Sequence, residues 1–276
     1  MGPTAIGKTA YAINLAKKLG TEIISCDSRQ FYQELNIGVA RPSEEELQAV
    51  PHHFIACRSV TNPFNVYSFE QEALQRIEQL FEHYDTVVAV GGSGLYIDAL
   101  SKGIALLPDP LPGLREQLKQ QLLTEGIESF QKQLQQLDPV YYARVDKQNP
   151  IRLQRALEVC ITAGRPYSEL LEQQRPKRNF VIKKTVLSAS PEMLRERINR
   201  RVDQMIDMGL EDEVRNVTPF RQFNTLNTVG YKEFFEAWDM GNYNTHNIAE
   251  TIKTHTWQYA KKQLTWIKRD SLADKA

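Results

Sequence analysis

The chain has 276 residues, of which 41% are apolar and 25% are charged, and its 34 Lys and Arg residues balance 34 Asp and Glu residues. This composition indicates a soluble globular protein with one large domain, or with a core and a smaller module. No apolar run approaches the ~20 residues of a membrane span and no signal-peptide pattern is present, so we expect a cytosolic protein. The balanced charge gives no overall reason to expect a polyanionic partner. Residues 175–201, however, contain nine Lys or Arg against two acids, which could hold phosphates or form a solvated helix face.

Cysteines and histidines do not indicate a metal or disulfide site. Cys26, Cys57 and Cys160 lie far apart and form no CxxC pair, which argues against both a zinc site and a disulfide framework. His52 and His53 have no acidic or Cys neighbours at ligand spacing, so we interpret them as polar core groups.

A glycine-rich phosphate-binding motif opens the chain. GPTAIGKT fits the P-loop pattern GxxxxGKT, in which a turn between a strand and a helix points backbone N–H groups at a phosphate chain. We expect the backbone amides of residues 4–7 to surround a diphosphate, Lys8 to neutralise it and the Thr9 hydroxyl to help hold Mg²⁺. ATP, GTP and non-nucleotide diphosphates all fit such a loop, and only Met1 stands where its preceding strand belongs. The motif comprises Gly2, Pro3, Thr4, Ala5, Ile6, Gly7, Lys8 and Thr9.

Short apolar strands alternate with helical patterns after this motif. KTAYAINLAKKLG predicts a helix that stops at Gly20, and TEIISCDS predicts a buried strand that ends at Asp27. The run VVAV predicts a strand covered on both faces, and NFVIKKTVLSAS supplies another. Strands separated by helices predict a parallel α/β sheet, a P-loop NTPase-like core flanked by helices. Ligands of such sheets collect at the carboxyl ends of the strands, where Asp27, Ser93 and the P-loop would meet.

The middle and the end of the chain are predicted to be helical. Residues 113–176 are Gln-rich and polar with no strand pattern, so we expect an all-helical insertion between two core segments, residues 1–112 and 177–276. A helix should start at Ser190 and Pro191 and stop at Gly209, and a long basic helix should follow near the C-terminus.

Three groups at the strand ends suit chemistry on a phosphate ester. DSRQFY offers a carboxylate, a hydroxyl, a guanidinium and an amide, which suits recognition of a base edge beside a proton acceptor; alternatively, Asp27 caps a turn or serves Mg²⁺. Ser93 of GGSGLY could donate to a phosphate oxygen, or the glycines could serve only the turn. Arg197 and Arg201, four residues apart, can converge on an anion or pair with nearby acids.

Aromatic and basic residues alternate in TWQYAKKQLTWIKR near the C-terminus. We expect Trp257 and Tyr259 to belong to the core. The rest of the segment is typical of a surface that faces a nucleic-acid backbone: Lys261, Lys262, Gln263, Trp266 and Lys268.

Eight blocks taken in order resemble the tRNA dimethylallyltransferases across nearly the whole chain. They are GPTAIGKT, DSRQFY, PHHFI, GGSGLY, NPIRLQRALEV, RINRRVDQMIDMGLEDEV, NTVGYKEF and KKQLTWIKR. Family members normally have an apolar strand before the glycine-rich loop, so the resemblance implies that this copy lacks its first strand through truncation or a misplaced start. The zinc finger of eukaryotic members is missing, which implies a bacterial-type enzyme that we expect to act as a monomer.

The resemblance implies a prenyl transfer to tRNA. A dimethylallyl group would pass from dimethylallyl diphosphate to N6 of the adenine 3′-adjacent to the anticodon, in tRNAs reading codons that start with U, with release of pyrophosphate. The P-loop with Lys8 would hold the donor diphosphate with Mg²⁺, which Thr9 would bind, while Mg²⁺ binding by Asp27 is the alternative to its role as proton acceptor. Asp27 would accept the amine proton, Ser93, where relatives commonly have Thr, would assist the leaving pyrophosphate, and Arg201 would neutralise its charge.

The resemblance also implies which residues contact the anticodon stem-loop, from which the target base must be extruded. The helical insertion would grip the stem. Asn227 and Lys268 lie where some relatives have Arg. The implied contacts are Asp27, Ser28, Arg29, Gln30, Ser93, Arg115, Ile151, Arg152, Leu153, Gln154, Arg155, Asn227, Thr228, Val229, Gly230, Tyr231, Lys232, Lys261, Lys262, Gln263, Leu264, Thr265, Trp266, Ile267 and Lys268.

Three other functions remain open at this point. The acceptor could be a free adenylate, although a small acceptor needs neither a long helical insertion nor a basic C-terminal helix. A P-loop small-molecule kinase would consume the γ-phosphate of ATP instead. An RNA-binding protein with a vestigial P-loop would bind tRNA without releasing pyrophosphate.

Overall fold

The structure is a computed structural model that describes residues 1–62, 64–173, 177–270 and 273–275. The chain divides into a core unit, residues 1–101 and 178–276, and a helical unit, residues 102–177. The helical unit therefore takes in the segment KGIALLPDPLP, which precedes the boundary at residue 113 that the composition suggested.

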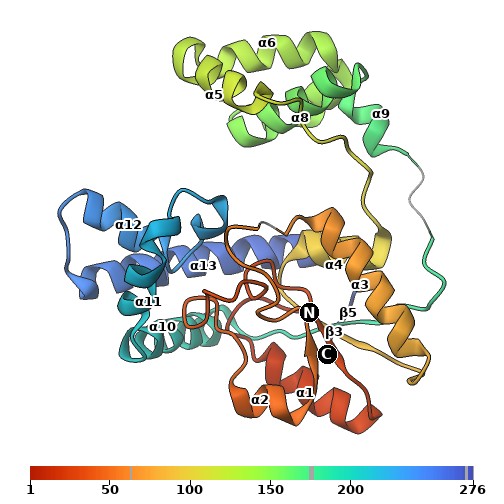
Figure 1. Ribbon diagram of the computed structural model, residues 1–276, viewed down its shortest axis with the longest axis vertical. Helices are drawn as coiled ribbons and strands as arrows, with labels where there is room; N and C mark the ends of the chain where they lie inside the picture. Colours follow the sequence, from red (N-terminus) through yellow and green to blue (C-terminus); the bar gives the residue numbers. More distant parts are fainter. Residues whose placement is uncertain (63, 174–176, 271–272, 276) are drawn as a thin grey trace. The chain divides into compact units, whose positions relative to one another are not determined.

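A three-stranded parallel sheet lies at the centre of the core unit (Figure 1). β1 (Ile23–Ser25) is fully buried and pairs with β2 (His52–His53) on one side and with β3 (Val88–Val90) on the other. The strands predicted before Asp27 and in VVAV are therefore confirmed. Both residues of β2 are only half-buried, so His52 and His53 are strand residues rather than core groups.

The outer strand β3 is less covered than its apolar sequence predicted. Val88 is buried, but Ala89 is exposed and Val90 is half-buried. Among the strands that the structure describes, β3 pairs only with β1, and an edge strand keeps part of its surface in contact with solvent. The expectation that this strand is covered on both faces was wrong.

Helix α1 (Lys8–Leu19) begins inside the P-loop motif, as predicted. Its Ala12, Ile13 and Ala16 pack on Ile23 and Val88 of the sheet. Gly20 ends the helix in the left-handed conformation, where its N–H bonds back to two carbonyls of the last turn. The spacing of small apolar residues thus sets the face that α1 buries and points its N-terminus at the carboxyl edge of the sheet.

Helices α10 (Pro191–Asp207) and α13 (Thr245–Arg269) pack against each other and support the P-loop (Figure 1). Ser190 caps α10 by accepting a hydrogen bond from the backbone of Met193, which confirms the predicted start. Ile198 of α10 and Ala260 of α13 form a buried cluster with Ile6 of the P-loop. The phosphate-binding turn is therefore fixed by two helices from the far end of the sequence.

Among the strands that the structure describes, β4 (Lys184–Val186) does not belong to the three-stranded sheet, although NFVIKKTVLSAS predicted it correctly as a strand. It pairs in parallel with β5 (Ala273–Lys275), a segment too short to give a periodic signal. On its other side the Met1 amine donates to the carbonyl of Thr185, and Leu187 N–H donates to the Met1 carbonyl. The residues around the P-loop thus connect directly to β4.

The remaining helices of the core unit surround these elements. The aromatic residues Phe31, Phe64 and Phe69 pack together where α3 covers the sheet. Short 3₁₀ turns span Thr218–Phe220 and Asn224–Leu226. The helices are α2 (Glu44–Ala49), α3 (Val66–Phe81), α4 (Gly94–Lys102, whose last residue opens the helical unit), α11 (Leu210–Val217) and α12 (Lys232–Asp239).

The helical unit contains only helices among its described residues. Leu118, Phe130, Leu134 and Leu157 form its core. The Gln-rich polar residues lie on the outer faces, which explains how a polar sequence still builds a stable core. Its helices are α5 (Leu114–Glu125), α6 (Ile127–Leu137), α7 (Pro139–Arg144), α8 (Pro150–Ala163) and α9 (Tyr167–Leu171).

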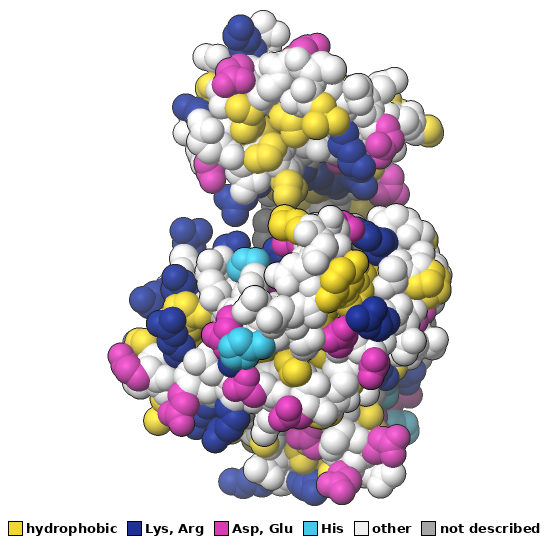
Figure 2. Space-filling view, turned by 90° about the vertical axis from the view of Figure 1, so that its left-hand side faces the viewer, with side chains coloured by type: hydrophobic (Ala, Val, Ile, Leu, Met, Phe, Trp, Pro, Cys, Tyr) yellow, Lys and Arg dark blue, Asp and Glu magenta, His cyan; other side chains and the backbone are white. Residues whose placement is uncertain are grey.

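Charges of both signs are interspersed on the face of the core unit shown in Figure 2. This agrees with the zero net charge of the sequence. Of the helices described, none combines the length and the apolar character that crossing a bilayer requires.

Candidate active site at the carboxyl edge of the sheet

The P-loop adopts a tight turn with two residues in the left-handed region. Ala5 has φ 62° and Gly7 has φ 96°, and α1 follows immediately. The left-handed conformation is free for glycine but costs alanine about 1–2 kcal/mol. Ala5 and Ile6 are buried against the α10 and α13 cluster, which holds the turn in place.

Lys8 lies inside the turn and is placed to meet an anion. Its Nζ donates to the carbonyl of Pro3 at 2.8 Å. Burial lowers the pKa of Lys8 to about 8, Asp27 opposes this, and Arg201 lowers the pKa further. Two cations close enough to repel one another at a buried site favour a ligand that carries negative charge.

The Asp27 carboxylate follows β1 and has one oxygen fixed and one oxygen free. Oδ1 accepts hydrogen bonds from the backbone N–H of Arg29 at 2.9 Å and of Gln30 at 3.4 Å. This turn arrangement is the capping role that the sequence left open. Within the part of the chain that the structure describes, no hydrogen bond reaches Oδ2. Asp27 is therefore held rigidly while Oδ2 can accept a proton from a ligand.

Ser93 lies next to Asp27, as its place at the sheet edge predicted. It is buried, its Oγ accepts a hydrogen bond from Ser28 N–H at 3.2 Å and it donates to Ser28 Oγ at 3.3 Å. The turn before it fits closely, because a Cβ at Gly91 would lie 2.4 Å from the carbonyl oxygen of Cys26. The glycine therefore serves the turn, and Ser93 stands beside the β1 end.

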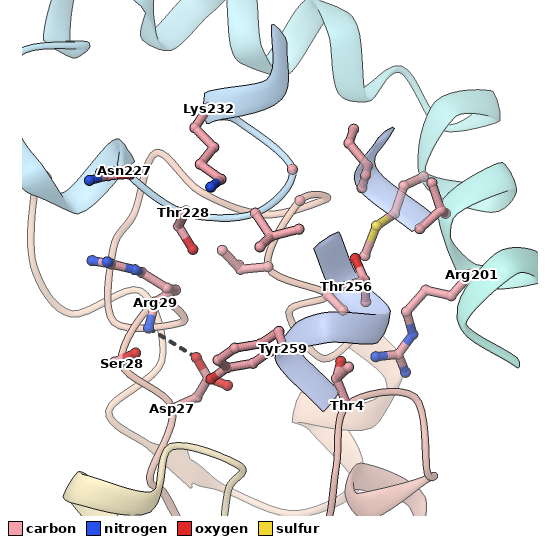
Figure 3. Close-up of a pocket in the computed structure, with 18 residues that line it drawn as sticks. Thr4, Asp27, Ser28, Arg29, Arg201, Asn227, Thr228, Lys232, Thr256 and Tyr259 are labelled. Atoms are coloured by element: carbon pink, nitrogen blue, oxygen red, sulfur yellow. Dashed lines mark hydrogen bonds between the residues drawn. The ribbon is translucent and has the colours of Figure 1, made fainter. Parts of the chain in front are cut away.

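A pocket of about 300 Å³ opens over this edge (Figure 3). Asp27, Thr4 and Arg201 contribute its polar side, and Val202, Met205 and Ile252 contribute apolar surface. The volume falls at the lower end of the ~300–1,000 Å³ that is usual for small-molecule sites. The other lining residues are Ser28, Arg29, Gly38, Val39, Ala40, Asn227, Thr228, Val229, Gly230, Lys232, Thr256 and Tyr259.

Of the two predicted anion-binding arginines, only Arg201 lines the pocket. Arg197 donates instead to the carbonyl of Ile6 at 3.2 Å and so braces the P-loop. Among the described residues, neither arginine forms an ion pair with the acids nearby, and Asp203 pairs with Lys253 instead. The two side chains therefore share a helix face but have different tasks.

Two residues predicted to contact RNA are occupied by structural bonds. The Gln30 amide donates to the carbonyls of Val39 at 3.2 Å and Ala40 at 2.9 Å, so it holds a wall of the pocket. Tyr231 is fully buried and its hydroxyl donates to Glu213 at 2.6 Å. Buried Tyr231 is a core residue and its prediction as an RNA contact was wrong.

Helix α13 corrects the prediction for the C-terminal segment most clearly. Gln263 is 7% exposed, so it does not face a nucleic-acid backbone. Tyr259, predicted to lie in the core, is 40% exposed and lines the pocket beside Asp27 (Figure 3). Desolvation of its hydroxyl in the pocket, and then the negative charge of Asp27, raise the pKa of Tyr259. Trp257 is partly buried against the P-loop cluster, as expected.

The rest of the segment divides between packing and solvent. The Trp266 ring packs on Gly94, where a Cβ would come within 2.4 Å, and its Nε1 donates to Asp98 at 3.0 Å. Leu264 packs in the P-loop cluster, and Ile267 is half-buried. The exposed members are Lys261, Lys262, Thr265 and Lys268.

In the helical unit, three residues predicted to contact RNA form hydrogen bonds to one buried acid, Glu158. Glu158, 3% exposed, accepts hydrogen bonds from Arg115 at 3.0 and 3.1 Å, from Gln154 at 3.0 Å and from Arg155 at 3.4 Å. Burial alone would raise the pKa of Glu158, but the bonds from Arg115 and Gln154 and the charge of Arg155 outweigh it and lower the pKa.

The neighbouring predicted contacts in α8 have opposite environments. Leu153 is fully buried in the core of the helical unit, so the prediction that it contacts RNA was wrong. Ile151 is 78% exposed and Arg152 is exposed, because both lie on the side of the helix away from the face that buries Leu153 and Leu157. The helical period thus separates core from surface within a segment that was predicted as one contact.

Sequence reasoning missed Tyr259, Thr256 and Glu158 as site residues. Thr256, Tyr259 and Gln263 recur at a spacing of three and four, which places them on one face of α13. Glu158 follows Gln154 by four and Arg155 by three residues, so the same spacing could have revealed its partners.

Fold and site define a P-loop α/β protein in which Arg201 and the free oxygen of Asp27 face one pocket and Lys8 lies in the P-loop turn. The sequence model of the IPP transferase family matches residues 30–270. The chain is 46% identical over 270 residues to a tRNA dimethylallyltransferase of Christiangramia forsetii, covering 98% of this chain and 89% of that one. It is 44% identical over 276 residues to the tRNA dimethylallyltransferase of Flavobacterium johnsoniae, covering 98% and 89%.

Solved structures agree with this likeness. A tRNA isopentenylpyrophosphate transferase from Bacillus halodurans aligns with a TM-score of 0.71 at 32% identity, covering 100% of this chain and 87% of that one. A eukaryotic dimethylallyltransferase acting on tRNA aligns with a TM-score of 0.81 at 25% identity, covering 96% and 68%. The chain therefore belongs to the IPP transferase family, which confirms the resemblance, the fold class and its assignment as a prenyltransferase.

Proposed function

We propose that this chain transfers a dimethylallyl group from dimethylallyl diphosphate to N6 of the adenine 3′-adjacent to the anticodon of a tRNA, with release of pyrophosphate. The names of its relatives support the reaction class, because those at 43–47% identity are called tRNA dimethylallyltransferases. We further propose that the chain acts as a monomer in the cytoplasm.

One observation carries the proposal: Asp27 has a fixed Oδ1 and a free Oδ2 in the same pocket as Thr4 and Arg201. As N6 attacks the allylic carbon, the nitrogen becomes positively charged and its proton becomes acidic. Oδ2 then takes the proton while Oδ1 keeps its backbone bonds, so the loop that carries Asp27 does not have to move. A carboxylate of ordinary basicity suffices for this transfer.

The cations opposite Asp27 suit the leaving group. When the carbon–oxygen bond breaks, the electron pair stays with the bridging oxygen and pyrophosphate departs. Lys8 and Arg201 place two positive charges where that negative charge grows, and both are already desolvated. The Ser93 hydroxyl, now bonded to Ser28, can rotate toward the same oxygen.

The donor set for Mg²⁺ fits an ion held chiefly by the substrate. No group of three His, Cys, Asp or Glu among the described residues could hold a metal. The Thr9 hydroxyl at the start of α1 would bind Mg²⁺ together with diphosphate oxygens and water, which leaves Asp27 Oδ2 available for the proton. Such a site is usual for Mg²⁺, which keeps several waters and binds one or two protein groups. When bound, the ion neutralises diphosphate charge.

The acceptor side of the pocket suits an extruded base. Asn227, Thr228 and Lys232 line it opposite Asp27, and Arg29 and Tyr259 lie between (Figure 3). An adenine in a stem-loop has to leave its stack to reach Oδ2. Lys261, Lys262 and Lys268 on α13, and Arg152 on α8, are exposed and available for phosphates.

The experiment is incubation with labelled dimethylallyl diphosphate and unmodified tRNA, with AMP and ATP as parallel acceptor and substrate controls. Label should enter tRNA at one adenine and pyrophosphate should appear in equal amount. Label that enters only AMP would instead identify an adenylate prenyltransferase. Loss of the ATP γ-phosphate would identify a kinase, and tRNA binding without pyrophosphate would leave only an RNA-binding protein.

A further inference from the structure

The buried side chain of Gln263 lies between the two loops that form the diphosphate end of the site. Its Oε1 accepts a hydrogen bond from the backbone N–H of Thr4 at 2.8 Å, and its Nε2 donates to the carbonyl of Gly92 at 2.8 Å. One amide therefore ties the P-loop to the turn that carries Ser93. The Thr4 N–H, which we expected to bind the diphosphate, is satisfied by Gln263 instead.

The contact is tight and leaves little freedom. A Cβ at Gly92 would lie 2.5 Å from Gln263 Nε2, 3.3 Å from the Gly2 carbonyl oxygen and 3.3 Å from Lys8 Nζ. The Ser93 turn thus rests directly on the P-loop and its lysine. Gln263 is also flanked on α13 by Tyr259, which lines the pocket, and by Trp266, which packs on Gly94.

Chemistry dictates why an amide occupies this position. The site offers one donor, Thr4 N–H, and one acceptor, the Gly92 carbonyl, and a primary amide supplies the complementary acceptor and donor. A carboxylate would serve only Thr4 and would repel both the carbonyl oxygen and a diphosphate. An apolar side chain would leave both backbone groups buried without partners, so it could not hold the two loops together.

We propose that Gln263 is a positioning residue for prenyl transfer, which sets the distance between the P-loop and Ser93 so that both act on the same leaving pyrophosphate. The inference rests on the proposed function. Gln263 touches neither the donor nor the tRNA: it acts through the two loops. Its loss would misplace the leaving-group contacts by a fraction of an ångström to one ångström, an error that costs catalysis about 10²-fold at other sites.

The test compares Gln263→Met with Gln258→Met, the same substitution at an exposed glutamine of the same helix. Single-turnover and steady-state prenyl transfer are measured with dimethylallyl diphosphate and tRNA, and active sites are titrated by the pyrophosphate burst. We expect kcat per active site to fall roughly 10- to 100-fold for Gln263→Met, with KM for tRNA changed less than twofold. Gln258→Met should match the wild type.

A double-mutant cycle with Ser93→Ala separates positioning from general stability. If Gln263 acts by aligning Ser93, its loss should cost much less once the Ser93 hydroxyl is absent, so the two effects should be strongly non-additive. If the Met variant does not fold, Gln263→Glu replaces it in the test, because glutamate keeps the side-chain volume and the hydrogen bond to Thr4. It should lower kcat and also raise KM for the donor, because a carboxylate then faces the diphosphate.

Three results would overturn the inference. The first is an unchanged kcat in both Gln263→Met and Gln263→Glu, and the second is additive effects of the Gln263 and Ser93→Ala substitutions. The third is a raised KM for tRNA at constant kcat, which would show that Gln263 contacts the RNA as the sequence predicted. Wild-type protein that transfers no prenyl group would reject the proposed function itself, so the two failures are distinguishable.

Discussion

Helix α13 of the core unit and helix α8 of the helical unit each contain one buried polar side chain, and the two are used differently. Gln263 bonds to the backbone of two loops, whereas Glu158 bonds to the flexible side chains of Arg115, Gln154 and Arg155. Backbone partners define a rigid distance, and side-chain partners define an orientation that solvent and ligands can still change. We infer that the core unit is organised for chemistry and the helical unit for adjustable binding.

Among the predicted effects, the largest should come from removing the proton acceptor of the core unit, which should lower turnover. Asp27→Asn keeps an oxygen for the Arg29 and Gln30 amides but removes the basic Oδ2. We expect turnover to fall roughly 10²- to 10⁴-fold, with tRNA affinity nearly unchanged. Stopped-flow transfer and filter binding measure the two quantities. The control is Asp85→Asn at an exposed site, and an active Asp27→Asn enzyme would remove Asp27 from the mechanism.

The pH dependence of donor binding tests the buried cation. Lys8 has a pKa of about 8 because it is buried, with Asp27 raising it and Arg201 lowering it. Below pH 8 Lys8 is mostly protonated and its ammonium group binds the diphosphate. Above pH 8 Lys8 is mostly neutral, so it must take up a proton before it can bind the diphosphate, and this weakens binding. Donor affinity should therefore fall about 10-fold from pH 7 to pH 9, a range in which the diphosphate, with phosphate pKa values near 6, keeps its charge.

Calorimetry in two buffers of different ionisation enthalpy measures this proton uptake directly. Lys8→Arg is the matched variant, since a guanidinium stays protonated throughout this range. Its donor affinity should be flat between pH 7 and pH 9. A wild-type protein that binds the donor equally at both pH values would contradict the desolvated lysine.

The carboxylate of the helical unit should affect binding only. Glu158→Gln keeps the shape but removes the charge that holds Arg115 and Arg155. We expect KM for tRNA to rise roughly 3- to 10-fold because the cations lose their preset orientation, with kcat at saturating tRNA unchanged. Glu116→Gln, at an exposed residue of α5 that pairs with Lys119, is the control. A fall in kcat for Glu158→Gln would end the distinction between the two regions.

The sequence alone was sufficient to predict the main helices and strands and the polar groups at the carboxyl edge of the sheet. Gly20 and Ser190 ended and started helices where expected, and Asp27 and Ser93 meet at the sheet edge because parallel strands end together. The ordered blocks identified the family.

Partners distant in sequence could not be predicted in this way. Gln263 reaches Thr4 across more than 250 residues, and no local pattern shows which α13 side chains turn inward. A motif describes a segment as a unit, yet the helical period buries Leu153 and exposes Ile151 two residues earlier. Packing therefore decided the roles that motifs had grouped together.

The smallest expected effect concerns the rigidity of the P-loop backbone. Ala5 is held at φ 62°, which strains the folded state by about 1–2 kcal/mol, and Ala5→Gly relieves this strain. Glycine also increases the conformational entropy of the unfolded chain, which destabilises the folded state by ~0.5–1 kcal/mol. The net result should be a gain of up to ~1 kcal/mol in the free energy of unfolding, measured by urea denaturation. Ala10→Gly in exposed α1 backbone should instead lose about 1 kcal/mol. If Ala5→Gly stabilises the fold but lowers kcat, the strained alanine contributes to the positioning that Gln263 provides from the other side; if kcat is unchanged, Gln263 alone is enough to hold the loop.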